Sequence, residues 1–493
     1  SYLYINPTFE QLRYISHHVD AYYYPVLKIT SGLTPYIDFT PLYGCYSYVF
    51  AFLQTIFNDN SLLFFSIINA IIVAIVLINF ALIINRVIKN KVIAFTTFLA
   101  MLFPMVIQCY RINNGPYLQY MPHRVLFCSI ILLFINIYLL YRKTVNKLII
   151  QIIGFIISAF SIFWNIETGL VILIVWTAFL GYEVLYFGNL KDKSTYKQIL
   201  KILIMAIMSL LLSFGIIIGI SYIRTGQIIL INNILESQIL FYKDGFYMIK
   251  MQLGKPWMIV IYTYMIGLAI SLRKLNFIND KRKILFNRSA MIFTLSILGI
   301  GIFSYYQGRS HDEVFSSVLY PFIILTGIFT EILLKRIYIS REKKLQVSNI
   351  IITSILILAI SFFAMKTITL LIQNNNIHLH MNKEKLKNVT ILDDFSNYDT
   401  SNMEFITEYE SLYYNRYNLK DTKKMPALVD LFTYKDYEKV VRYLEQTEKE
   451  VIVLDKMLLN FIKSNKEYEQ IIMEKFTIDK ETPMNIVLLN NQR

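Results

Sequence analysis

Ten long apolar segments dominate this chain of 493 residues. They cover residues 61–85, 92–109, 124–141, 148–163, 169–187, 202–223, 257–272, 289–304, 314–334 and 349–372. Most of them approach the ~20 residues that an α-helix needs to cross the hydrocarbon core of a bilayer. A bilayer offers no water to unsatisfied backbone groups, so segments of this kind span it as helices. The sequence therefore predicts a mainly α, polytopic membrane helical bundle with ten spans.

The density of basic residues alternates between successive connectors. Connectors 86–91, 142–147, 188–201, 273–288 and 335–344 carry 21 Lys or Arg residues and 3 Asp or Glu residues. The other connectors, together with residues 1–60, carry 9 and 9. Short loops rich in Lys and Arg stay in the cytoplasm. The pattern therefore predicts that residues 1–60, the polar clusters described below and the C-terminal segment lie on the external side of the membrane.

The bulk composition excludes several function classes. The net charge of +14 arises from the cytoplasmic connectors, so it indicates contact with anionic membrane lipid and no nucleic-acid partner. Three cysteines are too few for a disulfide framework or a thiolate metal cluster. The chain contains no HExxH, P-loop or GxSxG motif, and we predict no protein metal site from spacing.

The segments outside the spans divide the chain into three parts. Residues 1–60 are interrupted by proline and glycine, and we expect interfacial helices near 14–31 and 46–57 within this external loop. Because the chain starts on the external side, we also expect a further span before residue 1. Residues 61–372 form the bundle. In residues 373–493, short strand-like runs (389–392, 451–454 and 486–489) alternate with helix-like runs, which predicts a small external α/β domain.

The first external loop holds the first candidate site. His17, His18 and Asp20 come close together, and Asp38 follows a glycine and precedes Tyr43. A carboxylate in such a loop can take the proton of an acceptor hydroxyl as general base. A structural interpretation stays open for both acids. Asp20 can cap or solvate a surface helix, and Asp38 before Thr40 and Pro41 is typical of a turn.

Two further clusters lie at helix ends. Arg111 and Arg124 flank a Gly-Pro turn, where guanidinium groups can grip a phosphate. They can equally anchor the helix ends at the membrane surface. Trp164, Asn165 and Glu167 occupy a short turn between two spans. A carboxylate at that depth costs a few kcal/mol without a partner, so it indicates a functional site, or else a structural pair with a nearby Arg.

A fourth cluster, Arg309, Ser310 and His311, lies in a glycine turn between two spans. Arg309 and His311 can hold a phosphate and stabilise it as it leaves. A basic residue that only anchors a helix end is the alternative. If the external loops converge, the outer face offers carboxylates for base chemistry and Arg and His for a phosphate.

Together these motifs resemble those of the membrane-embedded glycosyltransferases of the GT-C fold, in a bacterial branch that uses polyprenyl-phosphate-linked sugars. The resemblance rests on loop 17–44, turn 164–169, turn 309–311 and a soluble tail with residues 430–432 before a helix. It implies a multi-pass protein of the bacterial plasma membrane with an external active site. The implied reaction is inverting transfer of a hexosyl or pentosyl group to an acceptor hydroxyl, with polyprenyl phosphate leaving. The acceptor is a glycan of the cell envelope, a lipid-linked glycan or a protein.

The resemblance also suggests roles for individual residues. An acid in the first external loop acts as base, and Asp38 lies in the better-matching stretch, with Asp20 as the competitor. Relatives open this loop with an acid where this chain has His17 and His18, which keeps that assignment open. Glu167 matches a second acidic position, where some GT-C enzymes bind a divalent cation such as Mg²⁺ or Mn²⁺. No residue of this sequence demands the metal.

Rival functions remain. A transporter or flippase for a lipid-linked sugar would carry polar groups in mid-membrane on broken helices. A ligase or polymerase of oligosaccharides would use diphosphate-linked donors at the same external face. A membrane-anchored binding protein would depend on the tail alone.

Overall fold

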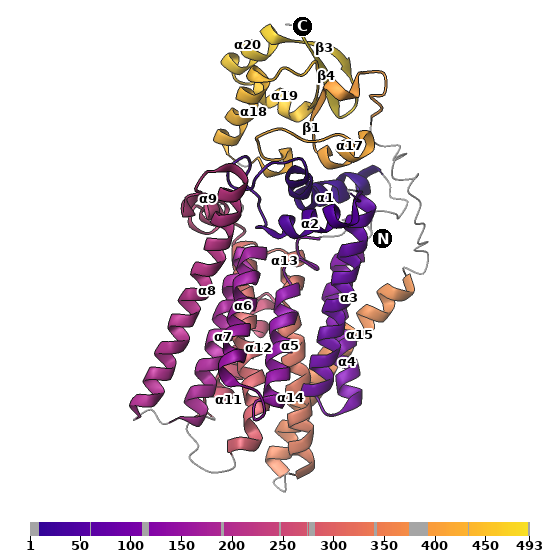
Figure 1. Cartoon of the computed structure of the whole chain (residues 1–493). Helices are drawn as coiled ribbons and strands as arrows, with labels where there is room; N and C mark the ends of the chain where they lie inside the picture. The colour runs from indigo at the N-terminus through magenta and orange to yellow at the C-terminus, as the bar shows by residue number, and fades with distance from the viewer. Residues whose placement is uncertain are drawn as a thin grey trace.

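The computed structural model describes residues 9–59, 61–110, 118–188, 192–245, 248–273, 275, 282–339, 343–373, 393–431 and 433–491. Within these ranges, the description of some segments, including residues 9–19 and 106–110, covers the backbone alone. Figure 1 shows a bundle of long helices that carries a small domain at one end, with two shorter helices between them. These two are α1 (Phe9–Thr30) and α2 (Tyr46–Phe57).

The bundle consists of long helices that occupy the predicted apolar segments. They are α3 (Leu62–Val87), α4 (Lys91–Tyr110), α5 (Leu126–Tyr141), α6 (Lys147–Trp164), α7 (Ile166–Phe187), α8 (Lys193–Thr225), α11 (Trp257–Arg273), α12 (Arg282–Gly308), α14 (Tyr320–Ile339) and α15 (Lys343–Gln373). Among the described residues, six are long and apolar enough to cross a membrane, namely α3, α6, α7, α8, α12 and α15. The protein is therefore a multi-pass membrane protein.

The surface of the bundle is apolar. Large side chains point outward from α8 and α15, for example Ile207 at 57% and Leu358 at 69% exposure. Exposure of such a continuous apolar face to water is unfavourable, whereas its contact with lipid tails is not. The outward face of these helices is therefore adapted to the hydrocarbon core of a bilayer.

Small residues bring α6 and α7 close together. A Cβ atom at Gly169 would lie 2.3 Å from the Cα of Ile162, and one at Gly154 would lie 2.1 Å from the Trp176 ring. Only glycine permits this approach of helix backbones. The pair is joined directly through Asn165, which ends α6 and caps α7 by accepting the N–H of Thr168 at 2.9 Å. This tight turn lies at the end of the bundle that faces the small domain (Figure 1).

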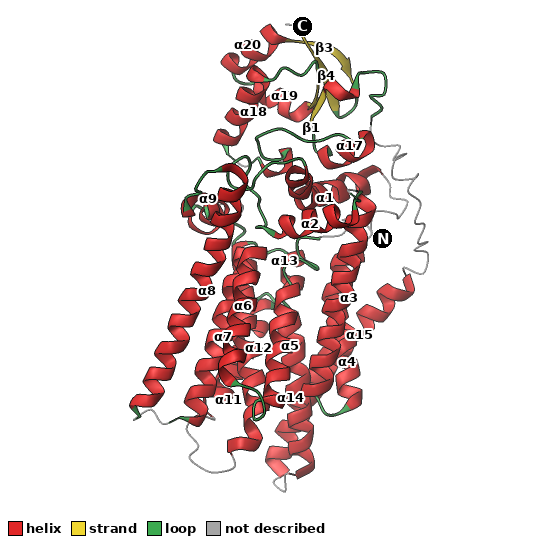
Figure 2. Ribbon diagram, in the orientation of Figure 1, coloured by secondary structure: helices red, strands yellow, loops and turns green. Residues whose placement is uncertain are grey.

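Short helices α9 (Ile231–Ile234) and α10 (Glu236–Gln238) and a π-helical turn (Ile239–Lys243) follow α8, and α13 (Asp312–Ser317) follows α12. These elements lie at the same end of the bundle as α1 and α2 (Figure 2). The basic connectors 86–91 and 142–147 lie at the opposite end (Figure 1).

The small domain is built on a four-stranded sheet in the order β1-β2-β4-β3. Its strands are β1 (Met403–Ile406), β2 (Val451–Asp455), β3 (Phe476–Glu481) and β4 (Asn485–Asn490). The first pair is parallel and the other two are antiparallel. Its helices are α17 (Glu410–Tyr417), α18 (Tyr434–Gln446), α19 (Lys456–Lys463) and α20 (Lys466–Lys475). The predicted fold class, a mainly α membrane bundle with a C-terminal α/β domain, is confirmed.

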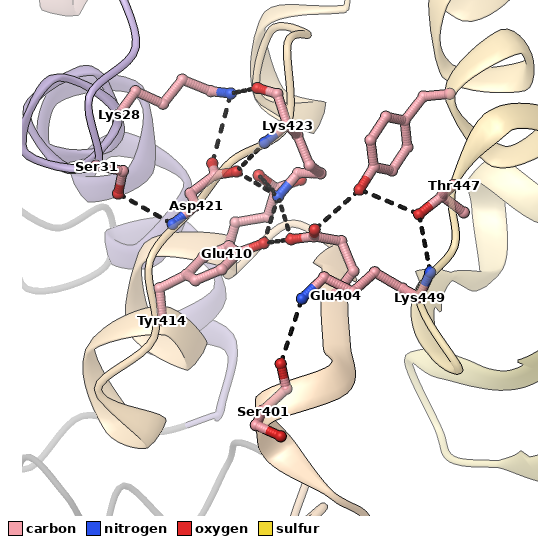
Figure 3. A network of polar contacts seen from close by, with 11 residues as sticks. Lys28, Ser31, Ser401, Glu404, Glu410, Tyr414, Asp421, Lys423, Thr447 and Lys449 are labelled. Carbon is pink, nitrogen blue, oxygen red and sulfur yellow. Dashed lines mark hydrogen bonds and ion pairs between the residues drawn. The ribbon is translucent and has the colours of Figure 1, made fainter.

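The small domain is attached to α1 through buried charges (Figure 3). Lys28 of α1 lies 3.4 Å from the carboxylate of Asp421, and its Nζ donates to the backbone oxygen of Lys423 at 2.5 Å. Lys423 in turn lies 3.1 Å from Asp421 and 3.3 Å from Glu404. Since an isolated buried charge is costly, such a network holds the two parts in one defined arrangement.

Candidate functional site

A small pocket lies where the bundle meets the N-terminal loop. It is lined by residues from five parts of the chain: Leu42, Tyr43, Arg124, Glu167, Phe241, Tyr242, Tyr305, Gly308 and Arg309. Its free volume is about 30 Å³. That volume accommodates roughly one water-sized group. A larger ligand therefore requires some of the lining side chains to move.

The loop at Tyr43 is fixed on the turn between α6 and α7. The N–H of Cys45 donates to the oxygen of Phe163 at 3.0 Å, and Asn165 Nδ2 donates to the oxygen of Tyr43 at 3.2 Å. Gly44 has φ +94°, and a Cβ atom there would lie 2.7 Å from the oxygen of Trp164. Trp164 and Asn165, both predicted as site residues, thus position the loop and do not line the pocket.

His123 connects these segments through contacts with Tyr22, Tyr43 and Asn165. Its Nδ1 lies 3.3 Å from the Tyr22 hydroxyl, and its Nε2 lies 3.1 Å from both the Tyr43 oxygen and Asn165 Nδ2. Burial and then the neighbouring Arg124 lower the pKa of His123 well below its ordinary value, so the imidazole is neutral. Sequence reasoning did not select His123 as a site residue, because nothing local separates it from its neighbours in the cluster of residues 111–124.

Arg124 and Glu167 form the charged wall of the pocket. Their side chains are paired and only 9% and 13% exposed. The guanidinium carbon of Arg124 also lies 4.0 Å from the centre of the Tyr305 ring. Its Nε is buried and has no hydrogen-bond partner among the described residues. Glu167 therefore has the Arg partner that the structural interpretation requires, and the pair also lines a pocket, while its functional role stays a prediction.

Arg309 also lines the pocket. Its guanidinium carbon lies 4.6 Å from the centre of the Phe241 ring. The same turn is joined to the connector between α8 and α11. Ile249 N–H donates to the oxygen of Gly308 at 3.3 Å, and the Ser310 hydroxyl donates to the oxygen of Ile249 at 2.7 Å. Ser310 and His311 are not among the described residues that line the pocket.

A second cavity continues from this pocket into the bundle. It shares Arg124, Glu167, Tyr242 and Tyr305 with the first. The further walls are mainly apolar and come from α7, α12 and the start of α14, and they include Val171, Ile302, Val318 and Tyr320. A charged pocket at the end of the bundle thus adjoins a second cavity of about 30 Å³ with mainly apolar walls.

The other predicted carboxylates lie outside this pocket, against the small domain. Asp20 is fully buried and accepts the N–H of Ser411 at 3.0 Å and its hydroxyl. Burial raises the pKa of Asp20 well above its ordinary value. Asp38 closes a turn by accepting the N–H of Thr34 at 2.8 Å and lies 3.3 Å from Lys424. The structure brings together Tyr43, Arg124, Glu167 and Arg309, but neither Asp20 nor Asp38 joins them.

Some predicted site residues are not described. His17 and His18 lie in the first part of α1, where only the backbone is described. Arg111 lies outside the described residues. Within the described residues, no three His, Cys, Asp or Glu side chains gather in an arrangement that could hold a metal ion.

No protein-family model matches the chain, and no curated protein matches it. Among solved structures, it is similar to the oligosaccharyltransferase of Archaeoglobus fulgidus in complex with Zn and sulfate. The match covers 95% of this chain and 69% of that chain, with a TM-score of 0.41 and 13% sequence identity.

Proposed function

We propose that the protein is an integral membrane glycosyltransferase that transfers a sugar from a polyprenyl-phosphate donor to an acceptor hydroxyl at the external face of a bacterial plasma membrane. The observation that carries the proposal is the charged pocket at the end of the bundle, adjoined by a small cavity with mainly apolar walls from α7, α12 and the start of α14. A donor of this class needs both features side by side, because its phosphate is anionic and its isoprenoid chain is apolar.

The two guanidinium groups support binding of the donor phosphate. Arg124 and Arg309 both line the pocket, and Arg124 is preoriented by Glu167 and the Tyr305 ring. Guanidinium groups donate in a fixed fork that matches phosphate oxygens. In a site shielded from water they stabilise the negative charge that grows as the leaving group departs.

The reaction balances without a cofactor. The acceptor hydroxyl oxygen forms a bond to the anomeric carbon while its proton passes to a carboxylate. The bond from that carbon to the phosphate oxygen breaks, and polyprenyl phosphate leaves with the electron pair. Attack opposite to the leaving group inverts the anomeric centre.

The identity of the base remains a prediction. Asp38 and Asp20 are bound by Lys424 and Ser411 of the small domain, so either can act only after α1 or the loop that follows it shifts toward the pocket. Glu167 already lines the pocket, where its partner is Arg124. The described lining of the pocket does not fit a divalent metal. Glu167 is the one carboxylate among these residues, and its side chain is already paired with Arg124. No step therefore runs through a metal.

The rival functions differ in what they require. A transporter needs its polar site near mid-membrane, whereas this pocket is lined by Leu42 and Tyr43 from the loop between α1 and α2 and by residues at helix ends. A ligase or polymerase that uses diphosphate-linked donors fits the same pocket. Comparison of monophosphate-linked with diphosphate-linked donors separates that alternative from the present proposal.

The decisive experiment uses the full chain in proteoliposomes with a panel of polyprenyl-phosphate sugars and a membrane glycan extract, read out by product mass. Arg309→Ala is expected to lower turnover by about 10²- to 10³-fold, the effect of removing one donor to a developing oxyanion. Arg442→Ala is the matched control, because Arg442 pairs only on the exposed face of α18. Undiminished transfer by Arg309→Ala, or product from diphosphate donors alone, contradicts the proposal.

A further inference from the structure

A larger cleft lies next to the pocket, on the other side of Leu42. Its volume is about 490 Å³, within the range of small-molecule sites. Three parts of the chain form it: residues 40–42 of the N-terminal loop, residues 232–244 after α8, and residues 426–436 of the small domain. Leu42 lines both spaces, and Leu240 of the cleft directly precedes Phe241 of the pocket. The two spaces therefore adjoin.

The charge of the cleft is opposite to that of the pocket. Its described lining includes four carboxyl groups, those of Glu236, Asp244, Asp430 and Asp436, and one ammonium group, that of Lys435. Two of the acids have structural roles, since Glu236 accepts from Thr40 at 3.1 Å and Asp436 closes the capping box of α18. Their charge still acts on the cleft. An anionic ligand is repelled here, while the arginines next door attract one.

The remaining lining is suited to hydroxyl groups. Asn232 and Asn233 offer amides that donate and accept, and Thr433 and Ser237 offer hydroxyls that do the same. Leu42, Ile239 and Pro426 add apolar surface between these polar groups. A sugar ring presents this same alternation, with hydroxyls around its edge and C–H groups on its faces.

Asp430 is an independent sign that a ligand belongs in the cleft. It lies at the end of a 3-10 turn (Leu428–Asp430), is 8% exposed and lines the cleft. Its Oδ1 is buried without a hydrogen-bond partner among the described residues. A buried polar atom normally has a partner, so an unmet one on a residue that lines a cleft indicates a missing donor or acceptor. Burial, then Glu410 and Asp436, raise the pKa of Asp430 to about 8, so its carboxyl can donate as well as accept.

We propose that this cleft binds the acceptor of the transfer as an uncharged or amine-bearing saccharide, with Asp430 hydrogen-bonded to one of its hydroxyls. The proposal rests on the proposed function, because the neighbouring pocket supplies the donor. It excludes polyanionic acceptors such as poly(glycerol phosphate). The acceptor enters between the small domain and residues 232–244 and meets the donor at Leu42.

Saccharide binding to the full chain in nanodiscs tests this assignment. The probes are cellotetraose (uncharged), a chitosan tetramer (amine-bearing), a glycerol phosphate trimer (anionic) and a lysine-containing hexapeptide, each titrated by calorimetry. We expect saturable binding of at least one saccharide and none of the phosphate oligomer. Asp430→Asn and Asn233→Ala should each weaken it at least tenfold. Asp430→Asn is nearly isosteric and removes no charge from the protonated acid, so folding is preserved. Glu467→Gln, on exposed α20, is the control and should bind like the wild type.

Several results overturn the inference. These are no saturable saccharide binding, equal or tighter binding of the phosphate oligomer, binding of the peptide alone, or full affinity in Asp430→Asn and Asn233→Ala. Polyprenyl phosphate, titrated into the same samples, keeps the two proposals apart. If saccharide binds and polyprenyl phosphate does not, the proposed function is contradicted and the assignment of the cleft as a saccharide site stands. If polyprenyl phosphate binds and saccharide does not, only the assignment of the cleft is contradicted.

Discussion

Replacement of Lys28 by methionine tests how the small domain is attached to the membrane part. Lys28 is fully buried, and its ammonium group contacts Asp421 and the oxygen of Lys423. Burial alone would raise the pKa of Asp421, but Lys28 and Lys423 lower it to about 2, so the carboxylate is charged at neutral pH. Methionine keeps most of the side-chain volume and removes the charge, which leaves part of that carboxylate uncompensated.

The expected loss of stabilising free energy is large for a single substitution. Breaking a buried pair by removing one partner costs about 3–5 kcal/mol. Since 1.4 kcal/mol is tenfold in an equilibrium constant, the domain should detach roughly 10²- to 10³-fold more often. Hydrogen exchange of the full chain in nanodiscs measures this as lost amide protection in α17 and residues 419–425.

The control is an exposed ion pair in the same domain. Lys456 lies 3.2 Å from Glu481, with side chains 33% and 56% exposed. Such pairs contribute about 0–1 kcal/mol, so Lys456→Met should change protection by less than tenfold. Equal protection in Lys28→Met and Lys456→Met would refute the reasoning that the buried network holds the domain.

Three further outcomes are expected. The raised pKa of Asp430 (about 8) and of Glu410 (about 7) means that the folded protein binds more protons than the unfolded chain, so stability should fall as pH rises from about 4 to 8. Asp430→Asn should reduce, but not abolish, the fall of the melting temperature between pH 5 and 8. An unchanged fall contradicts the raised pKa of Asp430. Asn165→Ala loses the cap of α7 and the hydrogen bond to Tyr43, which should cost about 1–2 kcal/mol in denaturant unfolding. In contrast, Asn146→Ala, which removes the cap at the other end of α6, should keep transfer activity. A single cysteine at Glu467 in whole cells should react with a membrane-impermeant maleimide, while one at Tyr338, which is 93% exposed at the basic end, should not; the opposite pattern would reverse the predicted orientation.

The apolar segments could be read from the sequence because bilayer thickness fixes both their length and their composition. The predicted segment 314–334 shows where this reasoning stops. The structure divides it into α13 and α14, since Pro321 lacks an N–H and fits the first turn of a new helix. In the small domain, β2 and β4 match predicted apolar runs, whereas the edge strand β3 is mostly exposed and charged and gave no apolar signal. The predicted strand at 389–392 lies outside the described residues.

The candidate site was predictable in part for a similar reason. Arg124, Glu167 and Arg309 each lie at a helix end on the same side of the membrane, so the alternation of spans alone brings them to one face. The positions of Asp20 and Asp38 depend on Ser411 and Lys424, almost 400 residues later in the chain. No periodicity or motif encodes a contact of that kind, which is why the carboxylates could be identified and their surroundings could not.

The same long-range contacts tie the small domain to the proposed chemistry. Its residues bind both predicted bases, through Ser411 and Lys424, and they supply one wall of the cleft at Asp430. The pocket at Arg124 and Arg309, in contrast, is lined by described residues of the bundle, its connectors and the N-terminal loop, and by no described residue of the small domain. Detachment of the domain in Lys28→Met should therefore lower the rate of transfer while polyprenyl phosphate binds with wild-type affinity. Loss of both in equal measure would show that the domain also shapes the donor pocket, and the division of donor and acceptor between the two parts would be wrong.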